Sequence, residues 1–100
     1  MSAADKVVLN SEVALNTVVL TAAGWSEDGP PFTQTVSVAG MTANATPEVG
    51  PVYSDDFVTA RAQMYAWSKI HEFKTAAGTV TFKCMKGKPL VNITAQIKGV

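Results

Sequence analysis

The chain has 100 residues, the length of one domain, and its 8 basic and 8 acidic side chains give a formal net charge of zero. A nucleic-acid partner normally needs a basic stripe, and a polybasic membrane anchor needs a cluster of lysine and arginine, so this balance argues against both. Apolar residues make up 47% of the chain, enough for a packed core, whereas charged residues make up only 16%. We therefore expect a neutral, polar surface that is partly buried against other subunits.

The N-terminus carries no targeting pattern. Asp5 and Lys6 stand where a secretory signal needs an apolar core. No apolar run approaches the roughly 20 residues that span a bilayer, so we expect no membrane insertion. We expect a single domain over residues 1–100, with residues 1–10 as a flexible arm or an arm that reaches a neighbouring subunit.

Alternation of apolar and polar residues predicts strands in the first part of the chain. Residues 13–20 predict one or two strands before Gly24. Residues 32–38 predict another, in which Gln34 interrupts the inward-facing apolar set. Prolines at 47 and 51 confine residues 46–53 to an edge strand or an extended connection.

The last part of the chain has the clearest alternation. Residues 80–84 and 91–97 each predict a strand with one face in the core and one in water. Ala77–Gly78 predicts a turn before the first of them. Lys86–Pro89 predicts a short hairpin that joins the two.

One stretch predicts a helix, over about residues 55–70. Ser54 would be its N-cap, and the carboxylates of Asp55 and Asp56 would complement the helix dipole in the first turn. Spacings of three and four predict an apolar stripe toward the core: Phe57, Ala60, Met64 and Trp67. We expect an α+β fold, mainly an antiparallel sheet or sandwich, covered by this one amphipathic helix.

No catalytic, cofactor or metal site is predicted. Asp55 and Asp56 are consecutive on the expected helix and point apart, so capping explains them better than a shared cation. His71 and Glu72 would face opposite sides of a strand, which excludes a base with its orienting acid. Cys84 falls on an inward face and is expected to be a buried, inert thiol. The sequence thus favours a protein that is not an enzyme.

Four residues are candidates for contact with a ligand or with another subunit. Trp25 follows a glycine beside a polar loop and is the aromatic residue that we expect to be most exposed, for example to a sugar. The alternative, that its ring fills one end of the sheet, is the more common situation. The others are Phe32, Lys86 and Lys88, on or beside the segments 27–31 and 86–89 that we expect to project outward.

An ordered set of motifs resembles short domains of phage and prophage virion proteins. It runs through Leu20–Ser26 (LTAAGWS), residues 29–42 (GPPFTQTVSVAGMT), an alanine-rich helix ending near Trp67, and the strand pair GTVTFKC and KPLVNITAQI. The family pattern is Pro-(Phe/Tyr)-Thr-Gln-Thr-Val-x-Val-x-Gly-x-Thr. The resemblance covers about residues 17–98.

The resemblance implies a structural or attachment role among tail, baseplate, fibre or capsid-decoration parts, with no catalytic or metal motif to carry over. It implies location in the virion after synthesis in the host cytoplasm, and a homo-oligomer. Independently, the low charge of a small β-rich domain suits burial between subunits, and we favour a trimer as a common closed arrangement. The partners implied are further copies of the chain and other virion proteins. The alternative function is an attachment module that binds a host-surface glycan through a loop aromatic such as Trp25.

Overall fold

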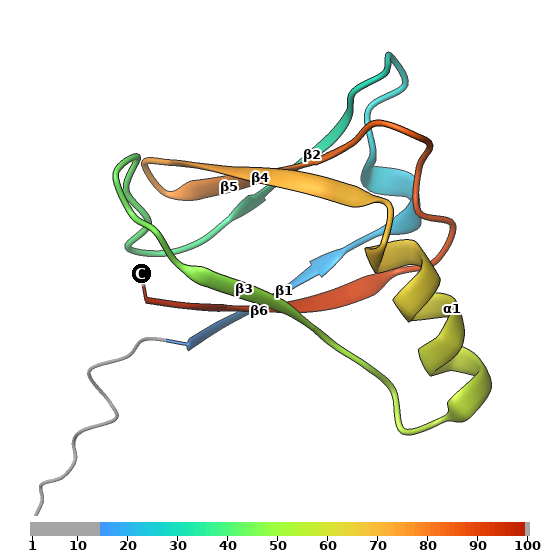
Figure 1. Cartoon of the computed structure of the whole chain (residues 1–100). Helices are drawn as coiled ribbons and strands as arrows, with labels where there is room; N and C mark the ends of the chain where they lie inside the picture. Colours follow the sequence, from blue (N-terminus) through green and yellow to red (C-terminus); the bar gives the residue numbers. More distant parts are fainter. Residues whose placement is uncertain (1–14, 100) are drawn as a thin grey trace, which may run out of the picture.

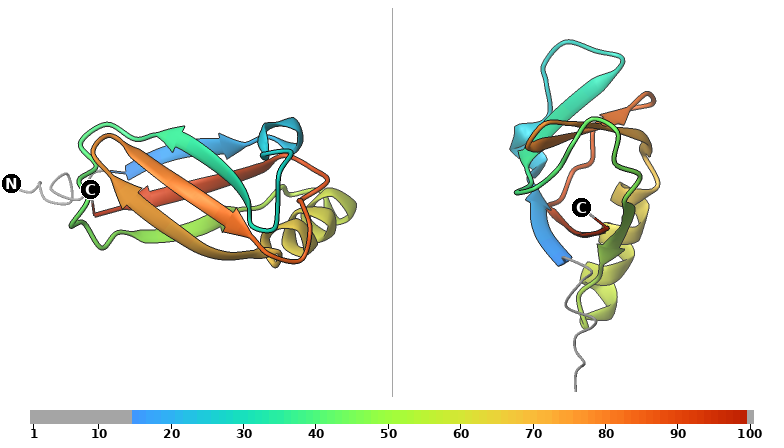
Figure 2. Two further views of the ribbon diagram at one scale, coloured as in Figure 1. Left: turned by 90° about the horizontal axis from the view of Figure 1, so that it is seen from above. Right: turned by 90° about the vertical axis from the view of Figure 1, so that its left-hand side faces the viewer.

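The computed structural model describes residues 15–99, which form two three-stranded antiparallel sheets packed face to face (Figure 1). One sheet has the order β1-β6-β3 and the other β2-β5-β4, and the helix α1 stands at one end of the two layers (Figure 2). The predicted α+β class with one helix is confirmed; residues 1–10 lie outside the described part. The elements are β1 (Leu15–Leu20), a 3-10 turn (Ala22–Gly24), β2 (Phe32–Ser37), β3 (Glu48–Val52), α1 (Phe57–Trp67), β4 (Ile70–Ala76), β5 (Thr79–Cys84) and β6 (Ile93–Lys98).

The central strands of the two sheets are β5 and β6, which have the clearest alternation in the sequence. Each pairs on both sides, and its inward residues are fully buried. Together they form the middle of a single core: Val80, Phe82 and Cys84 from one strand, and Ile93, Ala95 and Ile97 from the other. Because a strand presents alternate residues to opposite faces, the polar residues between them face outward.

The connection between these two strands differs from the prediction. Lys86–Pro89 does not form a hairpin, since β5 and β6 belong to different sheets. The chain after Cys84 crosses from one layer to the other, Pro89 is buried on the way, and pairing resumes only at Ile93. The alternation of apolar and polar residues could not predict that the two strands lie in different sheets, because it determines which face of a strand is buried and not which strand pairs with it.

Two other predictions about strands are confirmed. Ala77–Gly78 is the turn of the β4–β5 hairpin, where the positive φ of Gly78 (76°) suits a residue without a Cβ. The segment that contains Pro51 is β3, at the edge of its sheet. An edge tolerates proline because the missing N–H is not required for a second ladder.

The helix begins two residues later and ends three residues earlier than predicted. Its N-cap is Asp56 rather than Ser54: one carboxylate oxygen of Asp56 accepts hydrogen bonds from the backbone N–H (2.9 Å) and the hydroxyl (2.7 Å) of Thr59. The Ser54 hydroxyl accepts from the Asp56 N–H instead (3.0 Å). At the other end, Ser68 is the C-cap and the chain enters β4 at Ile70. Within residues 15–99 no helix has the length and apolar character needed to cross a membrane.

Candidate interaction surface

The helix α1 turns most of its large apolar side chains away from the sheets, whereas Trp67 at its end packs against the core. Phe57, Val58 and Tyr65 are 70%, 75% and 67% exposed, and Met64 is also more than half exposed. At 3.6 residues per turn these side chains lie within about 100° of Phe57, whereas Ala66, the buried residue of the helix, lies about 180° away. The predicted inward stripe is therefore wrong for Phe57 and Met64.

The attachment of the helix explains this orientation. The Trp67 ring meets the Phe82 ring edge-on, with centroids 6.4 Å apart, and the Gln63 side-chain oxygen accepts a hydrogen bond from the Ser54 N–H (2.8 Å). Around the helix Gln63 lies about 60° and Trp67 about 100° from Ala66, whose small side chain allows close approach to the core. The remaining apolar residues are left on the solvent side.

A second element extends this apolar surface. Leu90, in the crossing segment between the sheets, is 79% exposed and lines a hollow with Val58 and Ala62 of the helix. Asn92 anchors the same segment, because its side-chain oxygen accepts a hydrogen bond from the Ala22 N–H (2.8 Å). We call the set Phe57, Val58, Met64, Tyr65 and Leu90 the helix-end surface.

The charges near the helix-end surface lie over its aromatic rings. The Arg61 guanidinium is 5.6 Å from the centroid of Phe57, and the Lys69 ammonium is 5.0 Å from that of Tyr65. In such cation–π contacts the aliphatic parts of the Arg61 and Lys69 side chains lie along the apolar surface. A group of exposed large apolar side chains of this kind is typical of a contact with another protein.

Trp25 is buried, so the expectation that it is partly exposed is wrong. Only 3% of it is accessible, and it packs into the core with Leu20 and Phe82. Its neighbour Ser26 exchanges two hydrogen bonds with Thr33 on β2, which fixes the chain so that the indole turns inward. The ring fills the sandwich, as in the alternative considered from the sequence, and its indole N–H has no hydrogen-bond partner within residues 15–99.

The other three predicted contact residues separate into two places. The Lys88 ammonium lies 5.6 Å from the centroid of the half-buried Phe32 ring and 3.8 Å from the Glu27 carboxylate. These contacts join the segments 27–31 and 86–89, which were both expected to project. Lys86 is exposed and lines a different hollow, beside Tyr65.

His71 and Glu72 come together, contrary to the prediction. The Nε2 atom of His71 is 3.3 Å from one oxygen of Glu72, and the Lys83 ammonium is 3.6 Å from the other. The pairing of β4 with β5 shifts register between Ile70 and Glu72, so strict alternation fails at His71. The pair is open to solvent and itself lines a hollow, together with Trp67 of α1, Ile70 and Phe73 of β4, and Phe82 of β5.

Cys84 is buried, as the alternation predicted. Burial raises the pKa of its thiol to about 11, against a smaller lowering by the positive charge of Lys69. A thiol with this pKa is almost entirely protonated near neutrality, and only the thiolate is a good nucleophile. The arrangement is therefore that of a structural residue.

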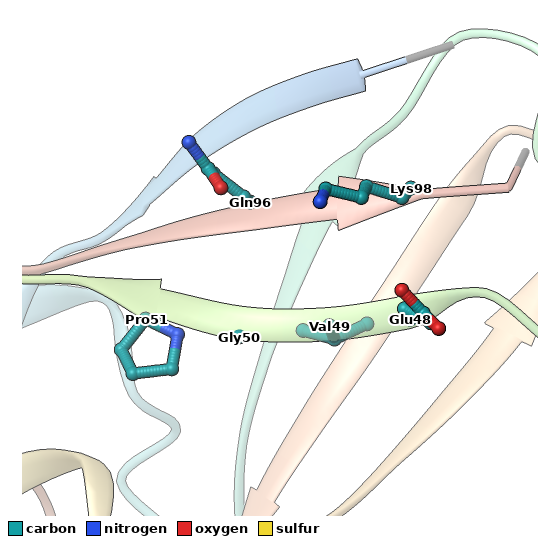
Figure 3. Close-up of a pocket in the computed structure, with 6 residues that line it drawn as sticks. All are labelled: Glu48, Val49, Gly50, Pro51, Gln96 and Lys98. Carbon is teal, nitrogen blue, oxygen red and sulfur yellow. The ribbon is translucent and has the colours of Figure 1, made fainter. Parts of the chain in front are cut away.

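Another hollow lies along β3 and β6 and is shown in Figure 3. It is lined by Glu48, Gly50 and Pro51 of β3 and by Gln96 and Lys98 of β6. A Cβ added at Gly50 would meet no atom within 4 Å, so the missing side chain leaves open space there. The hollow follows from the absence of a side chain on a polar sheet face rather than from converging ligand groups.

Within residues 15–99 no three side chains of His, Cys, Asp or Glu are grouped so that they could hold a metal ion. Comparison of the chain with protein-family models, with curated proteins and with solved structures finds no match in any of the three.

The helix-end surface was not predicted from the sequence, although the residue pattern of the helix indicates it. Residues 57–67 carry apolar side chains on both sides of the helix, and Arg61 is the one charged residue among them. An ordinary surface helix has a polar face for solvent. Its absence here indicates a second apolar contact beyond the core.

Proposed function

We propose that this chain is a non-enzymatic structural component of a bacteriophage or prophage virion, an accessory part of a tail, baseplate, fibre or capsid decoration. It self-associates and binds other virion proteins, and its place of action is the particle. The helix-end surface is its contact with those proteins.

One observation carries the proposal: four large side chains of α1 are more than half exposed, although Trp67 of the same helix packs against the core and Ala66 is buried. Exposing several large apolar side chains together is unfavourable for a chain that acts alone. Each exposed side chain lacks the favourable free energy that burial of its apolar surface away from water would contribute. The resemblance over residues 17–98 supports the phage setting, and the 16% of charged residues suits a surface that is covered in an assembly.

The alternative, a module that binds host-surface glycans through Trp25, loses its main support. A stacking platform for a sugar has to be accessible, and Trp25 is 3% exposed. No other observation favours this alternative.

The test is incorporation into particles. Particles released from the bacterium that encodes the chain are separated on a density gradient, and the chain is detected in the particle fractions. We expect the double variant Val58→Ser, Leu90→Ser to be lost from these fractions while it remains folded by circular dichroism.

The matched control is Val19→Ser, which replaces another exposed valine on the outer face of β1. It should be incorporated like the unchanged chain. Absence of the unchanged chain from all particle fractions would overturn the proposal, and undiminished incorporation of the double variant would exclude the helix-end surface as the contact.

A further inference from the structure

The sheet β2-β5-β4 has one edge without a strand partner, at β4. The segment 43–45 contacts this strand only near its end, where the Thr75 hydroxyl donates hydrogen bonds to the carbonyls of Ala43 (3.1 Å) and Ala45 (3.5 Å). This strand pairs with β5 on one side and with no other strand of the described part on the other. The opposite edge, β2, is contacted by Ser26, which exchanges hydrogen bonds with Thr33. In the other sheet, the edge strand β3 carries Pro51 as the fourth of its five residues. At seven residues β4 is also longer than β2 or β3. An exposed edge of this kind is a template for another strand.

The side chains of β4 are arranged so that the strand complements itself. Glu72 and Lys74 lie on the outer face, opposite Lys83 and Thr81 of β5, with Phe73 between them on the inner face opposite Phe82. Lys74 makes no ion pair with any residue between 15 and 99. Glu72 is 3.6 Å from Lys83 and still open to solvent, and a carboxylate has capacity for a further partner.

We propose that two copies of the chain pair antiparallel along β4, about a two-fold axis at Phe73. Glu72 of each copy then lies directly opposite Lys74 of the other, and the two Phe73 residues face each other. Directly opposed residues of an antiparallel pair have Cβ atoms about 4.5–5.5 Å apart, within reach of both ion pairs. The two sheets become one continuous six-stranded sheet.

The charges select this register over its neighbours. Opposed residues share a face of the sheet, so a shift by one position is excluded because it would set Phe73 against a residue of the outer face. A two-fold axis at Glu72 would oppose the two glutamates, and one at Lys74 would oppose the two lysines. Like charges directly opposite each other are destabilising, and the axis at Phe73 is the register that avoids both.

The pairing also covers an apolar ring that the single chain leaves open. Phe73 is 37% exposed although its ring lies 6.0 Å from that of Phe82 in the core. It lines the hollow beside β4 that Trp67 and Ile70 also line. A second Phe73 across the axis would extend this aromatic row from the core to the centre of the dimer.

This inference specifies the self-association in the proposed function and rests on it, with a two-fold contact in place of the trimer expected from the sequence. The experiment measures mass by light scattering during size exclusion and affinity by sedimentation equilibrium. We expect the unchanged chain to form a dimer of about 21 kDa, twice its 10.5 kDa. Lys74→Glu and Glu72→Lys should each weaken the dimer about tenfold or more, because each opposes like charges at both symmetric positions.

Rescue distinguishes pairing from damage to the fold. The double variant Glu72→Lys, Lys74→Glu restores opposite charges across the axis and should recover the dimer. An equimolar mixture of the two single variants should form a heterodimer, since one chain carries two acids and the other two bases at positions 72 and 74. Circular dichroism of each variant verifies that the chain is folded.

The outcomes separate the two proposals. A dimer or trimer that is indifferent to these charges overturns the β4 contact while self-association stands. An unchanged chain that stays monomeric at about 100 μM overturns both the β4 contact and self-association. Loss of the dimer in the single variants without recovery in the mixture also overturns the proposed register.

Discussion

The side chain of Gln34 makes two hydrogen bonds to the backbone of Thr21, one from its amide nitrogen to the Thr21 carbonyl and one from the Thr21 N–H to its oxygen, each 3.0 Å long. Gln34 thus acts like the backbone of a neighbouring strand and joins β2 to the end of β1. Gly24 lies so close that a Cβ there would stand 2.6 Å from the Gln34 oxygen.

We expect Gln34→Leu to destabilise the fold by about 1–3 kcal/mol, because it removes the partner of the Thr21 N–H, whereas the Thr21 carbonyl keeps its hydrogen bond from the Gly24 N–H (3.1 Å). The free energy of unfolding in urea measures this effect. Gln96→Leu, on the outer face of β6, is the matched control and should stay within about 0.5 kcal/mol of the unchanged chain. Equal stability of the two variants would contradict the role assigned to Gln34.

Trp25→Ala should destabilise the fold by about 3–5 kcal/mol, because it leaves a large cavity in the core. Trp25→Phe should cost much less, since it keeps an aromatic ring and removes an indole N–H that has no partner within residues 15–99. Thermal and urea unfolding of the two variants give the comparison. A phenylalanine variant as unstable as the alanine variant would indicate that the indole N–H does have a partner.

The helix-end surface should contribute little to the fold itself. Phe57→Ala is expected to change the free energy of unfolding by no more than about 0.5 kcal/mol, as at ordinary exposed positions. Phe82→Ala, which removes a fully buried ring, should cost about 3–5 kcal/mol. Urea unfolding at low protein concentration separates the two, and a large cost at Phe57 would mean that its ring is buried within one chain.

The helix cap should make stability depend on pH in the acid range. Hydrogen bonds from the hydroxyl and backbone of Thr59 hold the pKa of Asp56 below 3.8, so the folded state favours the ionised carboxylate. This contribution is present above the pKa of the unfolded chain and is lost as the pH falls through the lower pKa of the folded chain. Asp56→Ala should therefore lower the melting temperature at pH 7 and flatten its dependence on pH below 4.

The control for the cap is Asp55→Ala, since the Asp55 side chain makes no hydrogen bond within residues 15–99. Melting curves between pH 2 and 7 for both variants give the test. If both variants lower the melting temperature at neutral pH by a similar amount, the negative charge before the helix stabilises the fold rather than the hydrogen bonds of the cap.

Cys84 should be inert in the folded protein. With a pKa of about 11 its thiolate is roughly one part in a thousand at pH 8, and the sulfur is buried on the central strand β5. We expect no measurable reaction with a thiol reagent over an hour at pH 8, and complete reaction in 8 M urea. Rapid stoichiometric labelling of the folded chain would show that β5 opens locally.

Local patterns in the sequence determined the centre of this protein. The alternation of residues 80–84 and 91–97 predicted the two strands that are central and their inward faces, because the side-chain period of a strand is two whatever its neighbours are. In the second of them pairing begins only at Ile93, two residues later than predicted. Pro51 indicated an edge strand or an extended connection, and Ala77–Gly78 indicated the turn, because each depends on the backbone of the residue itself. Cys84 was placed in the core for the same reason.

Only the tertiary structure decided which strands are neighbours and which surfaces remain open. The strands β5 and β6 are consecutive in the chain but pair with strands of different sheets. The register shift between Ile70 and Glu72 brings the side chains of His71 and Glu72 together. β4 was not predicted as a complete strand because most of its residues are exposed on both faces and its sequence does not alternate. Which face of α1 points to solvent depends on how the helix packs against the sheets. This packing is determined by long-range contacts rather than by the pattern of residues within the helix.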